Sequence, residues 1–260
     1  MSEHKEKFSG RVKEYAQYRA RYSTQIIATL EAQCGLRKED VIADVGAGTG
    51  MLAELFLEHG NSVIAVEPNA EMLAVCAAMQ ERHPALRTVM ASAEETTLAD
   101  ASVDFVVVGR AFHWFDAERA RAEFARILRP GGWLVLASVG RRREDTTPVG
   151  QGYREVLQRI TPEYAEIIKR FNIYDNAEQF FAGSIVLREL FESEELMTLE
   201  MLIGQTQSIS FAPLAGEAGH AAMVEMLTEF FARYAENGTL RMPMASYLIC
   251  IQLGQSDTSR

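Results

Sequence analysis

Short apolar runs alternate with segments of helical periodicity along the first half of the chain. The runs of strand length are 41–45, 62–67, 86–90, 103–108 and 133–139. Between them apolar positions recur at three- and four-residue steps, which predicts amphipathic helices. Asn69 stands where one of these helices would begin, and Gly60 stands where another would end. Continuous apolar strands that alternate with helices predict a mostly parallel sheet covered by helices on both faces.

The pattern differs at the two ends of the chain. Apolar and tyrosine side chains recur at helical steps over 11–34, which predicts an N-terminal helical segment. Beyond Gly140 we expect an inserted group of helices over 141–183, because about 40 residues make a poor core alone. The helices expected there lie near 153–160, 162–171 and 176–181. The remaining elements expected are strands at 184–191 and 246–253, which close the sheet as a hairpin-like pair, and helices near 194–202 and 218–235 between them.

Composition places the chain among ordinary globular proteins. It has 260 residues, 48% of them hydrophobic and 24% charged, with a formal net charge of −10. A negative surface repels phosphate backbones, so we expect no nucleic-acid partner. No apolar run approaches the ~20 residues that a membrane span needs, and the charged N-terminus lacks a signal-peptide core, so we expect a cytoplasmic protein. Three scattered cysteines, Cys34, Cys76 and Cys250, match no metal-ligand spacing and are interpreted as reduced apolar residues.

The residues Asp44-Val45-Gly46-Ala47-Gly48-Thr49-Gly50 join the first strand to the next helix. Glycines let the backbone bend sharply and let a ligand approach the main chain closely. The helix that follows presents free N–H groups, which suit a carboxylate or a phosphate. We therefore expect a nucleotide-like ligand at the carboxyl end of the sheet.

The details of this loop indicate which nucleotide. The dinucleotide fingerprint GxGxxG is incomplete, because Met51 stands where the third glycine belongs. No lysine follows in the position that a P-loop requires. Glu67 ends the second strand, where a carboxylate can accept hydrogen bonds from both hydroxyls of a ribose. Loop and acid together favour a nucleoside ligand over a dinucleotide or a nucleoside triphosphate.

Four segments resemble the ordered motif series of class I S-adenosylmethionine-dependent methyltransferases: VIADVGAGTG, SVIAVEPNAEML, ASAEETTLADASVDFVVVGRAFHWFD and EFARILRPGGWLVLAS. AFHWFD and the C-terminal layout are similar to the trans-aconitate methyltransferase-like branch. The resemblance implies a single domain with a Rossmann-like, seven-stranded, mostly parallel sheet whose last strand is antiparallel. Its expected parts are a helical lid over 1–35, a cofactor-binding core over 36–140, a helical cap over 141–183 and a C-terminal part over 184–260. It also implies S-adenosyl-L-methionine as cofactor and a small organic acceptor, with O-methylation foremost and C-, N- and S-methylation open.

The same resemblance implies roles for individual residues. Gly46, Gly48 and Gly50 would line the methionine part of the cofactor, and Glu67 would bind the ribose. The complete set expected to bind the cofactor is Tyr18, Arg19, Asp44, Gly46, Ala47, Gly48, Gly50, Glu67, Pro68, Asn69, Met72, Ser92, Ala93, Glu94, Gly109 and Arg110. Within it, Ser92, Ala93 and Glu94 are expected at the adenine edge, since a backbone amide and a carboxylate supply the donor and the acceptor that adenine needs. Alternatively, Glu94 lies in a solvated loop and Met72 belongs to the core.

The segment 109–116 follows the long strand 103–108, where the reacting methyl group would sit. Methyl transfer needs a nucleophile held near attack distance in a dry site, and aromatic faces favour a sulfonium cation. His113 is the candidate general base, since its pKa before perturbation lies near neutrality. Alternatively, His113 and Trp114 pack the loop against the sheet, as we expect Phe112 and Phe115 to do. The expected acceptor pocket consists of Tyr22, His113, Trp114 and Arg141.

The remaining assignments stay open between function and packing. The segment 15–22 resembles the family's lid pattern Y-x-x-x-R-P-x-Y, with Ala20 in place of proline. Its Arg19 pairs either with an anion of cofactor or substrate, or only with solvent. The basic run 141–143 either holds an acidic substrate or is a solvated loop, and the aromatic residues of 164–181 either roof the pocket or pack the helices. A nicotinamide-dependent oxidoreductase and a cofactor-binding sensor are the alternative functions, and we expect a monomer or a homodimer without a metal.

Overall fold

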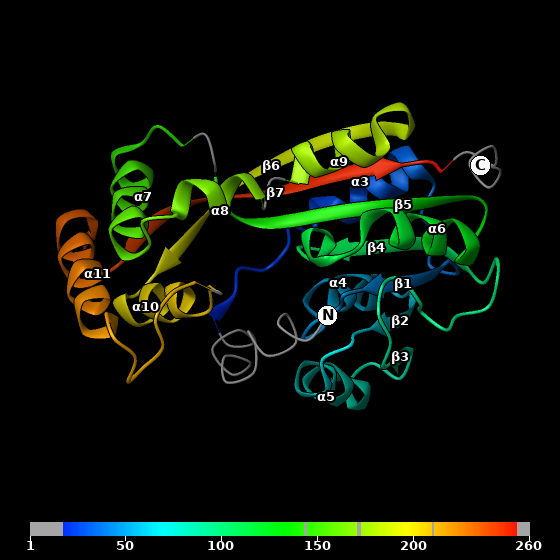
Figure 1. Cartoon of the computed structure of the whole chain (residues 1–260), viewed down its shortest axis with the longest axis horizontal. Helices are drawn as coiled ribbons and strands as arrows, with labels where there is room; N and C mark the ends of the chain where they lie inside the picture. Colours follow the sequence, from blue (N-terminus) through cyan, green and yellow to red (C-terminus); the bar gives the residue numbers. More distant parts are fainter. Residues whose placement is uncertain (1–17, 143–144, 171–172, 210, 254–260) are drawn as a thin grey trace. The chain divides into compact units, whose positions relative to one another are not determined.

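The computed structural model describes residues 18–142, 145–170, 173–209 and 211–253 (Figure 1). The strands in these ranges are β1 (Val41–Val45), β2 (Ser62–Val66), β3 (Leu86–Val89), β4 (Val103–Gly109), β5 (Leu128–Arg141), β6 (Ile185–Met197) and β7 (Leu240–Ile251). They form one sheet in the order β3-β2-β1-β4-β5-β7-β6. Six strands are parallel and β7 runs against them, which confirms the predicted Rossmann-like sheet.

The chain divides into two compact units. The first unit comprises Met1–Ala20, Val139–Arg170 and Phe191–Ser246, and the second comprises Arg21–Ser138, Phe171–Leu190 and Tyr247–Arg260. The second unit holds the glycine loop and the strands β1 to β4, and the first holds most of the helices that follow Gly140. The predicted division at residues 35, 140 and 183 stays a prediction.

The register of the second unit brings three loops to one edge of the sheet. Val45 at the end of β1 pairs with Val66 at the end of β2, and Asp44 pairs with Val107 of β4. Because these strands are parallel, their carboxyl ends meet at the same edge. The loops that begin at Gly46, Glu67 and Arg110 therefore start side by side, as the sequence predicts.

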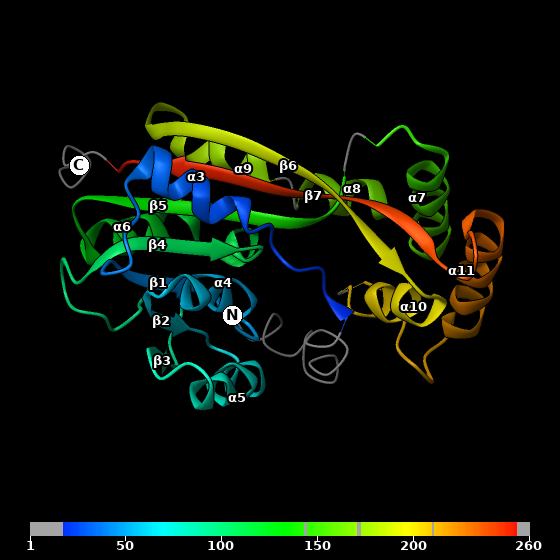
Figure 2. The ribbon, with the colours of Figure 1, turned by 180° about the vertical axis from the view of Figure 1, so that it is seen from behind.

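Helices cover both faces of the sheet in the second unit. They are α3 (Gln25–Cys34), α4 (Met51–His59), α5 (Ala70–Ala78), α6 (Ala117–Ile127) and α9 (Ile173–Phe181). In the two views, α6 and α9 lie on one face, and α3 and α4 lie on the other (Figures 1 and 2). Ile26, Phe56 and Phe124 from these helices are fully buried against the sheet. Truncating an aromatic side chain of this kind to alanine costs about 3–5 kcal/mol, so the core holds the loop edge rigidly.

The first unit contains the helices α7 (Pro148–Ile160), α8 (Tyr164–Arg170), α10 (Leu199–Gln207) and α11 (His220–Tyr234). Tyr153 of α7 packs on Phe230 of α11 with ring centroids 5.8 Å apart, and its hydroxyl lies 2.9 Å from Thr206 Oγ1 of α10. The helices predicted at 153–160, 162–171 and 218–235 are confirmed, although α7 already begins at Pro148 because Thr147 caps it. The longest, α11, has 15 residues, and no helix in the described ranges is long and apolar enough to cross a membrane.

The helix predicted near 194–202 is wrong in its first half. Strand β6 continues to Met197, and α10 begins only at Leu199 after Thr198, whose side chain accepts a hydrogen bond from Met201 N. The run Glu192–Glu195 has residues of good helix propensity, but pairing with β7 overrides that preference. For the same reason both strands are longer than the predicted 184–191 and 246–253.

Candidate cofactor site at the carboxyl edge of the sheet

The glycine loop turns at three residues whose positive φ angles would strain the backbone of any other residue type. Gly46, Gly48 and Gly50 have φ angles of 70°, 57° and 87°. A β-carbon on Gly46 would lie 2.5 Å from Cβ of Ala111, and one on Gly50 would lie 2.3 Å from Cε of Met79. The glycines therefore bring the loop against the strand exit at Ala111 and against α5. Part of their role is this close packing, which leaves the backbone itself at the edge of the site.

Glu67 is held by the backbone of the two loops beside it. The backbone N–H of Gly48 donates to Oε2 of Glu67 at 2.9 Å, and the N–H of Asn69 donates to Oε1 at 2.8 Å. Asn69 in turn caps α5, its side chain accepting from the backbone of Glu71 and Met72. Only 7% of Glu67 is exposed, so its orientation is fixed. A carboxylate oxygen can accept more than one hydrogen bond, so an acid fixed in this way is suited to bind ligand hydroxyls.

Asp44 is the least expected polar group of the site. It is fully buried at the end of β1, and neither of its carboxyl oxygens has a hydrogen bond of ordinary geometry among the described residues. Burial raises the pKa of Asp44 to about 7; the backbone amide of Ala53 opposes this rise and the charge of Glu67 adds to it. Buried polar atoms are normally well paired, so a buried carboxyl whose one neighbouring donor in the described chain is the Ala53 amide has room for a further donor.

Two further groups beside this loop support the same conclusion. The hydroxyl of Thr49 is also buried without a partner among the described residues. The pKa of Cys76 is raised to about 12, first by burial and then by the negative charges of Asp44 and Glu67. The surroundings of the loop are therefore electronegative, which favours a ligand that carries positive charge. Neither residue was predicted in the site: Thr49 lies within the glycine motif, and Cys76 was interpreted as a reduced apolar residue.

The adenine-side residues divide into two groups. Met72 is buried with its Sδ 3.7 Å from the position of a β-carbon on Gly48, so it lines the loop from α5. Ala93 is buried, whereas the carboxylate of Glu94 accepts a hydrogen bond from the backbone N–H of Asp116 at 2.9 Å. Asp116 is the N-cap of α6. Glu94 thus links the loop after β3 to the loop after β4.

The exit of β4 is tight and strained. A β-carbon on Gly109 would lie 2.6 Å from the hydroxyl of Tyr22, so this tyrosine lies against the strand exit, as the predicted acceptor pocket requires. Arg110 has a φ angle of 58°, which side chains rarely adopt, and its N–H donates to Ala137 O at 3.0 Å. Strain of this kind persists where the surroundings fix it and often marks functional segments.

Aromatic rings follow directly after Arg110. His113 and Trp114 are half-buried, with ring centroids 4.8 Å apart. Phe112 is buried against Phe115 and against Phe180 and Phe181 of α9, as expected for core residues. The packing of Phe112 anchors the segment. Whether His113 acts as a base stays a prediction.

Three of the predicted site residues lie in the first unit. The hydroxyl of Tyr18 donates to Glu200 Oε1 at 2.8 Å, and Arg19 donates to the carbonyl of Ser208 at 2.7 Å. The guanidinium of Arg141 lies over the ring of Tyr153, 4.9 Å from its centroid. Their roles toward cofactor and acceptor stay predictions. Of the other residues considered from the sequence, Tyr15, Arg143 and Phe171 lie outside the described residues.

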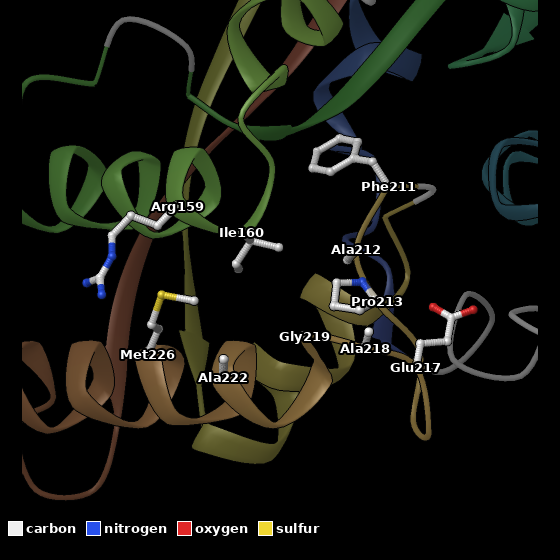
Figure 3. A pocket seen from close by; sticks show the side chains of 10 residues that line it. All are labelled: Arg159, Ile160, Phe211, Ala212, Pro213, Glu217, Ala218, Gly219, Ala222 and Met226. Atoms are coloured by element: carbon white, nitrogen blue, oxygen red, sulfur yellow. The ribbon is translucent and has the colours of Figure 1, made fainter.

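A separate pocket of about 370 Å³ lies within the first unit (Figure 3). Ile160 at the end of α7, Phe211, Pro213 and Met226 of α11 give it apolar side chains, and Arg159 and Glu217 give it charged ones. None of the site residues predicted from the sequence lines it. It is therefore distinct from the loop edge of the second unit.

Comparison with known proteins agrees with the motifs. A family model described as a methyltransferase domain matches residues 43–136. The uncharacterized methyltransferase Rv3342 of Mycobacterium tuberculosis is 40% identical over 139 residues, which are 51% of this chain and 56% of the relative. A malonyl-[acyl-carrier protein] O-methyltransferase of Pectobacterium atrosepticum is 32% identical over 48% of this chain and 47% of the relative. The chain thus spans about half the length of these curated relatives.

Solved structures support the same fold. A structure described as a putative type II methyltransferase from Anaeromyxobacter dehalogenans aligns with a TM-score of 0.63 at 22% identity, over 90% of this chain and 97% of that one. A Haemonchus contortus N-methyltransferase in complex with S-adenosylhomocysteine aligns with a TM-score of 0.52 at 16% identity, over 93% of this chain and 57% of that one. Residues 43–136 thus match a methyltransferase domain, and the fold around them is that of solved structures described as methyltransferases.

Proposed function

We propose that this protein transfers the methyl group of S-adenosylmethionine to a small organic acceptor and releases S-adenosylhomocysteine. The observation that carries the proposal is the buried carboxyl of Asp44, whose two oxygens have no hydrogen bond of ordinary geometry among the described residues, beside the fixed carboxylate of Glu67. An ammonium group of the cofactor would donate to Asp44, and the ribose hydroxyls would donate to the carboxylate of Glu67.

The charge of the site also separates this function from the alternative oxidoreductase. A nicotinamide dinucleotide would bring a pyrophosphate to the glycine loop, next to Asp44 and Glu67. Two carboxyl groups that already raise the pKa of Cys76 disfavour such an anion. A methyl-donating nucleoside carries an ammonium and a sulfonium instead, and both charges are favourable there.

The residues of this chain then have distinct tasks. Asp44 and the loop from Gly46 to Gly50 would hold the amino-acid part, and Glu67 would hold the ribose. Met72 and Ala93 would enclose the adenine. The rings of Tyr22, Trp114 and Phe115 would exclude water near the methyl group, and His113 would take a proton from the acceptor. The bound cofactor supplies an electrophilic methyl group.

We propose oxygen as the acceptor atom. The similarity to a malonyl-[acyl-carrier protein] O-methyltransferase supports this assignment. A carboxylate acceptor is already anionic at neutral pH and needs no base, whereas a hydroxyl acceptor would need His113. The substrate is a small molecule, and we propose a cytoplasmic protein that binds neither membrane nor nucleic acid, in keeping with the charge of −10.

Calorimetric titration with S-adenosylhomocysteine and, separately, with NADH tests the cofactor. We expect micromolar binding of the first and none of the second, and the reverse result would contradict the proposal. Methyl transfer is then measured over a panel of carboxylates, phenols, amines and thiols. If the cofactor binds and no acceptor in the panel is methylated, the sensor function gains support. With an acceptor in hand, His113→Ala should lower kcat and leave the affinity for S-adenosylhomocysteine unchanged.

A further inference from the structure

Strand β6 forms one edge of the sheet and carries an unusual set of exposed side chains. Within the described ranges, β7 is the one strand that pairs with it, so its outer edge offers unpaired backbone groups (Figure 2). Four large apolar residues are exposed in the described chain, and three of them, Val186, Leu190 and Leu196, lie on β6. Natural edge strands are usually short or rich in lysine and proline. With 13 residues and neither lysine nor proline, β6 is long for an edge strand, and its five charged residues are the protection that it carries.

The order of side chains along β6 is complementary to itself. The midpoint of Ile185–Met197 is Phe191. If two copies pair in antiparallel fashion about this residue, side chains equally far from Phe191 lie opposite each other. Val186 then faces Leu196 of the second copy, and Arg188 faces Glu194. Because all these residues lie on one continuous strand, the strand itself sets their spacing.

This register has two advantages over the neighbouring one. Pairing about Phe191 overlaps the full length of both strands and joins apolar to apolar at both ends, Ile185 to Met197 and Val186 to Leu196, although it also places Leu190 opposite Glu192 and Leu187 opposite Glu195. Pairing about Leu190 also joins opposite charges, Arg188 to Glu192, but it places Val186 opposite Glu194 and Ile185 opposite Glu195, so that the apolar ends lose their partners. The period of two keeps the exposed face of both copies on the same side in either register.

The charged residues of β6 already have partners within one chain. Arg188 pairs with Glu178, Glu192 with Arg142 at 2.7 Å, and Glu194 with Arg241 at 3.5 Å. Between 39% and 69% of each of these six side chains is exposed. Exposed ion pairs contribute little, so Arg188 and Glu194 can exchange or share partners at small cost.

We propose that β6 is a homodimerisation surface, on which a second copy of this chain adds its own β6 in antiparallel register centred on Phe191. The result is one continuous sheet across the dimer. On the exposed face, two Val186–Leu196 pairs and two Arg188–Glu194 pairs flank the central Phe191 pair, and Leu190 lies opposite Glu192 next to it. A surface of one strand per copy is small, so we expect a dissociation constant of about 1–100 µM.

Sedimentation velocity of the full chain measures this association directly. We expect a species of twice the chain mass of 29.0 kDa to grow with concentration over that range. Arg188→Glu and Glu194→Arg should each weaken self-association about tenfold or more, since each places like charges opposite one another. A mixture of the two variants should form heterodimers as tightly as the unsubstituted chain, because both opposite-charge pairs return. Met90→Glu, at an exposed apolar residue outside β6, should leave association unchanged.

Engineered disulfides test the register separately. Under mild oxidation, Phe191→Cys should cross-link to itself, because the two central residues face each other. Ser193→Cys should not, but it should cross-link to Glu189→Cys in a mixture. The unsubstituted chain, which has the half-buried Cys34, shows how much cross-linking the native cysteines give under the same oxidation. A chain that stays monomeric at about 100 µM, or an Arg188→Glu variant that associates like the unsubstituted chain, would overturn the proposal. Because association needs no cofactor, its failure is distinguishable from failure of the proposed function.

Discussion

The backbone N–H of Gly48 donates to the carboxylate of Glu67 at 2.9 Å, so the glycine loop and the acid of the second strand are one structure. The bond requires that Gly48 turn with a φ angle of 57° and that Glu67 be buried at the end of β2. The spacing between the glycine loop and Glu67 in the sequence thus corresponds to a direct contact in the structure. It also fixes the carboxylate before any ligand arrives, which lowers the entropy that binding must overcome.

Replacing Glu67 by alanine should weaken S-adenosylhomocysteine binding by about 1–3 kcal/mol, the cost of a lost hydrogen bond to a charged group. The variant also leaves the N–H groups of Gly48 and Asn69 without their acceptor. Isothermal titration calorimetry measures the difference. Glu71→Ala is the matched control, because Glu71 is an exposed acid in the first turn of α5, the helix that follows Glu67. Equal affinity of Glu67→Ala and the unsubstituted chain would contradict the ribose assignment.

The titration of Asp44 predicts a pH dependence of binding. Its pKa is raised to about 7 in the free protein, mainly by burial. A bound ammonium favours the ionised carboxylate, so binding should release a proton at pH values below about 7. The affinity for S-adenosylhomocysteine should therefore rise up to tenfold per unit as pH increases toward about 7, and then level off. Calorimetry from about pH 5.5 to about pH 8 measures this dependence. In Asp44→Asn the dependence should disappear along with much of the affinity.

The same group should act on stability in the opposite direction. A carboxyl whose folded pKa exceeds its unfolded value of about 4 holds a proton in the folded chain over the range between them. The contribution of this protonation to the free energy of unfolding is complete below the unfolded pKa. It is lost as pH rises through the folded pKa of about 7. The free protein should therefore lose thermal stability across this range, and Asp44→Asn should lose less. A Tm of the variant that falls as steeply as that of the unsubstituted chain would contradict this account.

The core of the fold could be predicted because its signals are local. Buried parallel strands are continuous apolar runs, and Asn69 caps a helix with its own side chain. Glu67 was predicted to bind ribose from its place after the second strand, and Tyr22 was predicted in the acceptor pocket from its likeness to a lid pattern. Glu67 contacts the glycine loop and Tyr22 lies against the exit of β4, while their roles toward ligands stay predictions.

What the sequence could not predict depends on contacts between distant segments. The acidic run in β6 favours a helix locally, and only its pairing with β7 makes it a strand. Glu94 stands in a motif that resembles an adenine site, yet its carboxylate meets the amide of Asp116, 22 residues away. Likewise, the raised pKa of Asp44 follows from burial of the whole strand end, which no motif records.

Glu94 gives a prediction that separates positioning from adenine recognition. Glu94→Gln keeps a carbonyl oxygen that can accept from Asp116 N, whereas Glu94→Ala removes it. If Glu94 positions the segment 110–116, amide hydrogen exchange there should quicken several-fold in the alanine variant and stay normal in the glutamine variant. If Glu94 instead accepts a hydrogen bond from the adenine amine, Glu94→Ala should lower the affinity for S-adenosylhomocysteine without changing hydrogen exchange in this segment. The exposed neighbour Glu95 provides the control, since Glu95→Ala should change neither quantity.

Two glycines with similar backbone angles separate strain from steric overlap. Gly50 has a φ angle of 87° and Gly131 one of 82°, so alanine strains the backbone about equally at both, by about 1 kcal/mol. At Gly131 a β-carbon meets nothing within 4 Å, whereas at Gly50 it would lie 2.3 Å from Met79 Cε and 2.8 Å from Cys76 Sγ. Urea unfolding should therefore show that Gly50→Ala costs about 1–3 kcal/mol more than Gly131→Ala. Equal losses of stability would mean that Met79 moves aside freely. Glycine would then be required at position 50 by the backbone conformation alone.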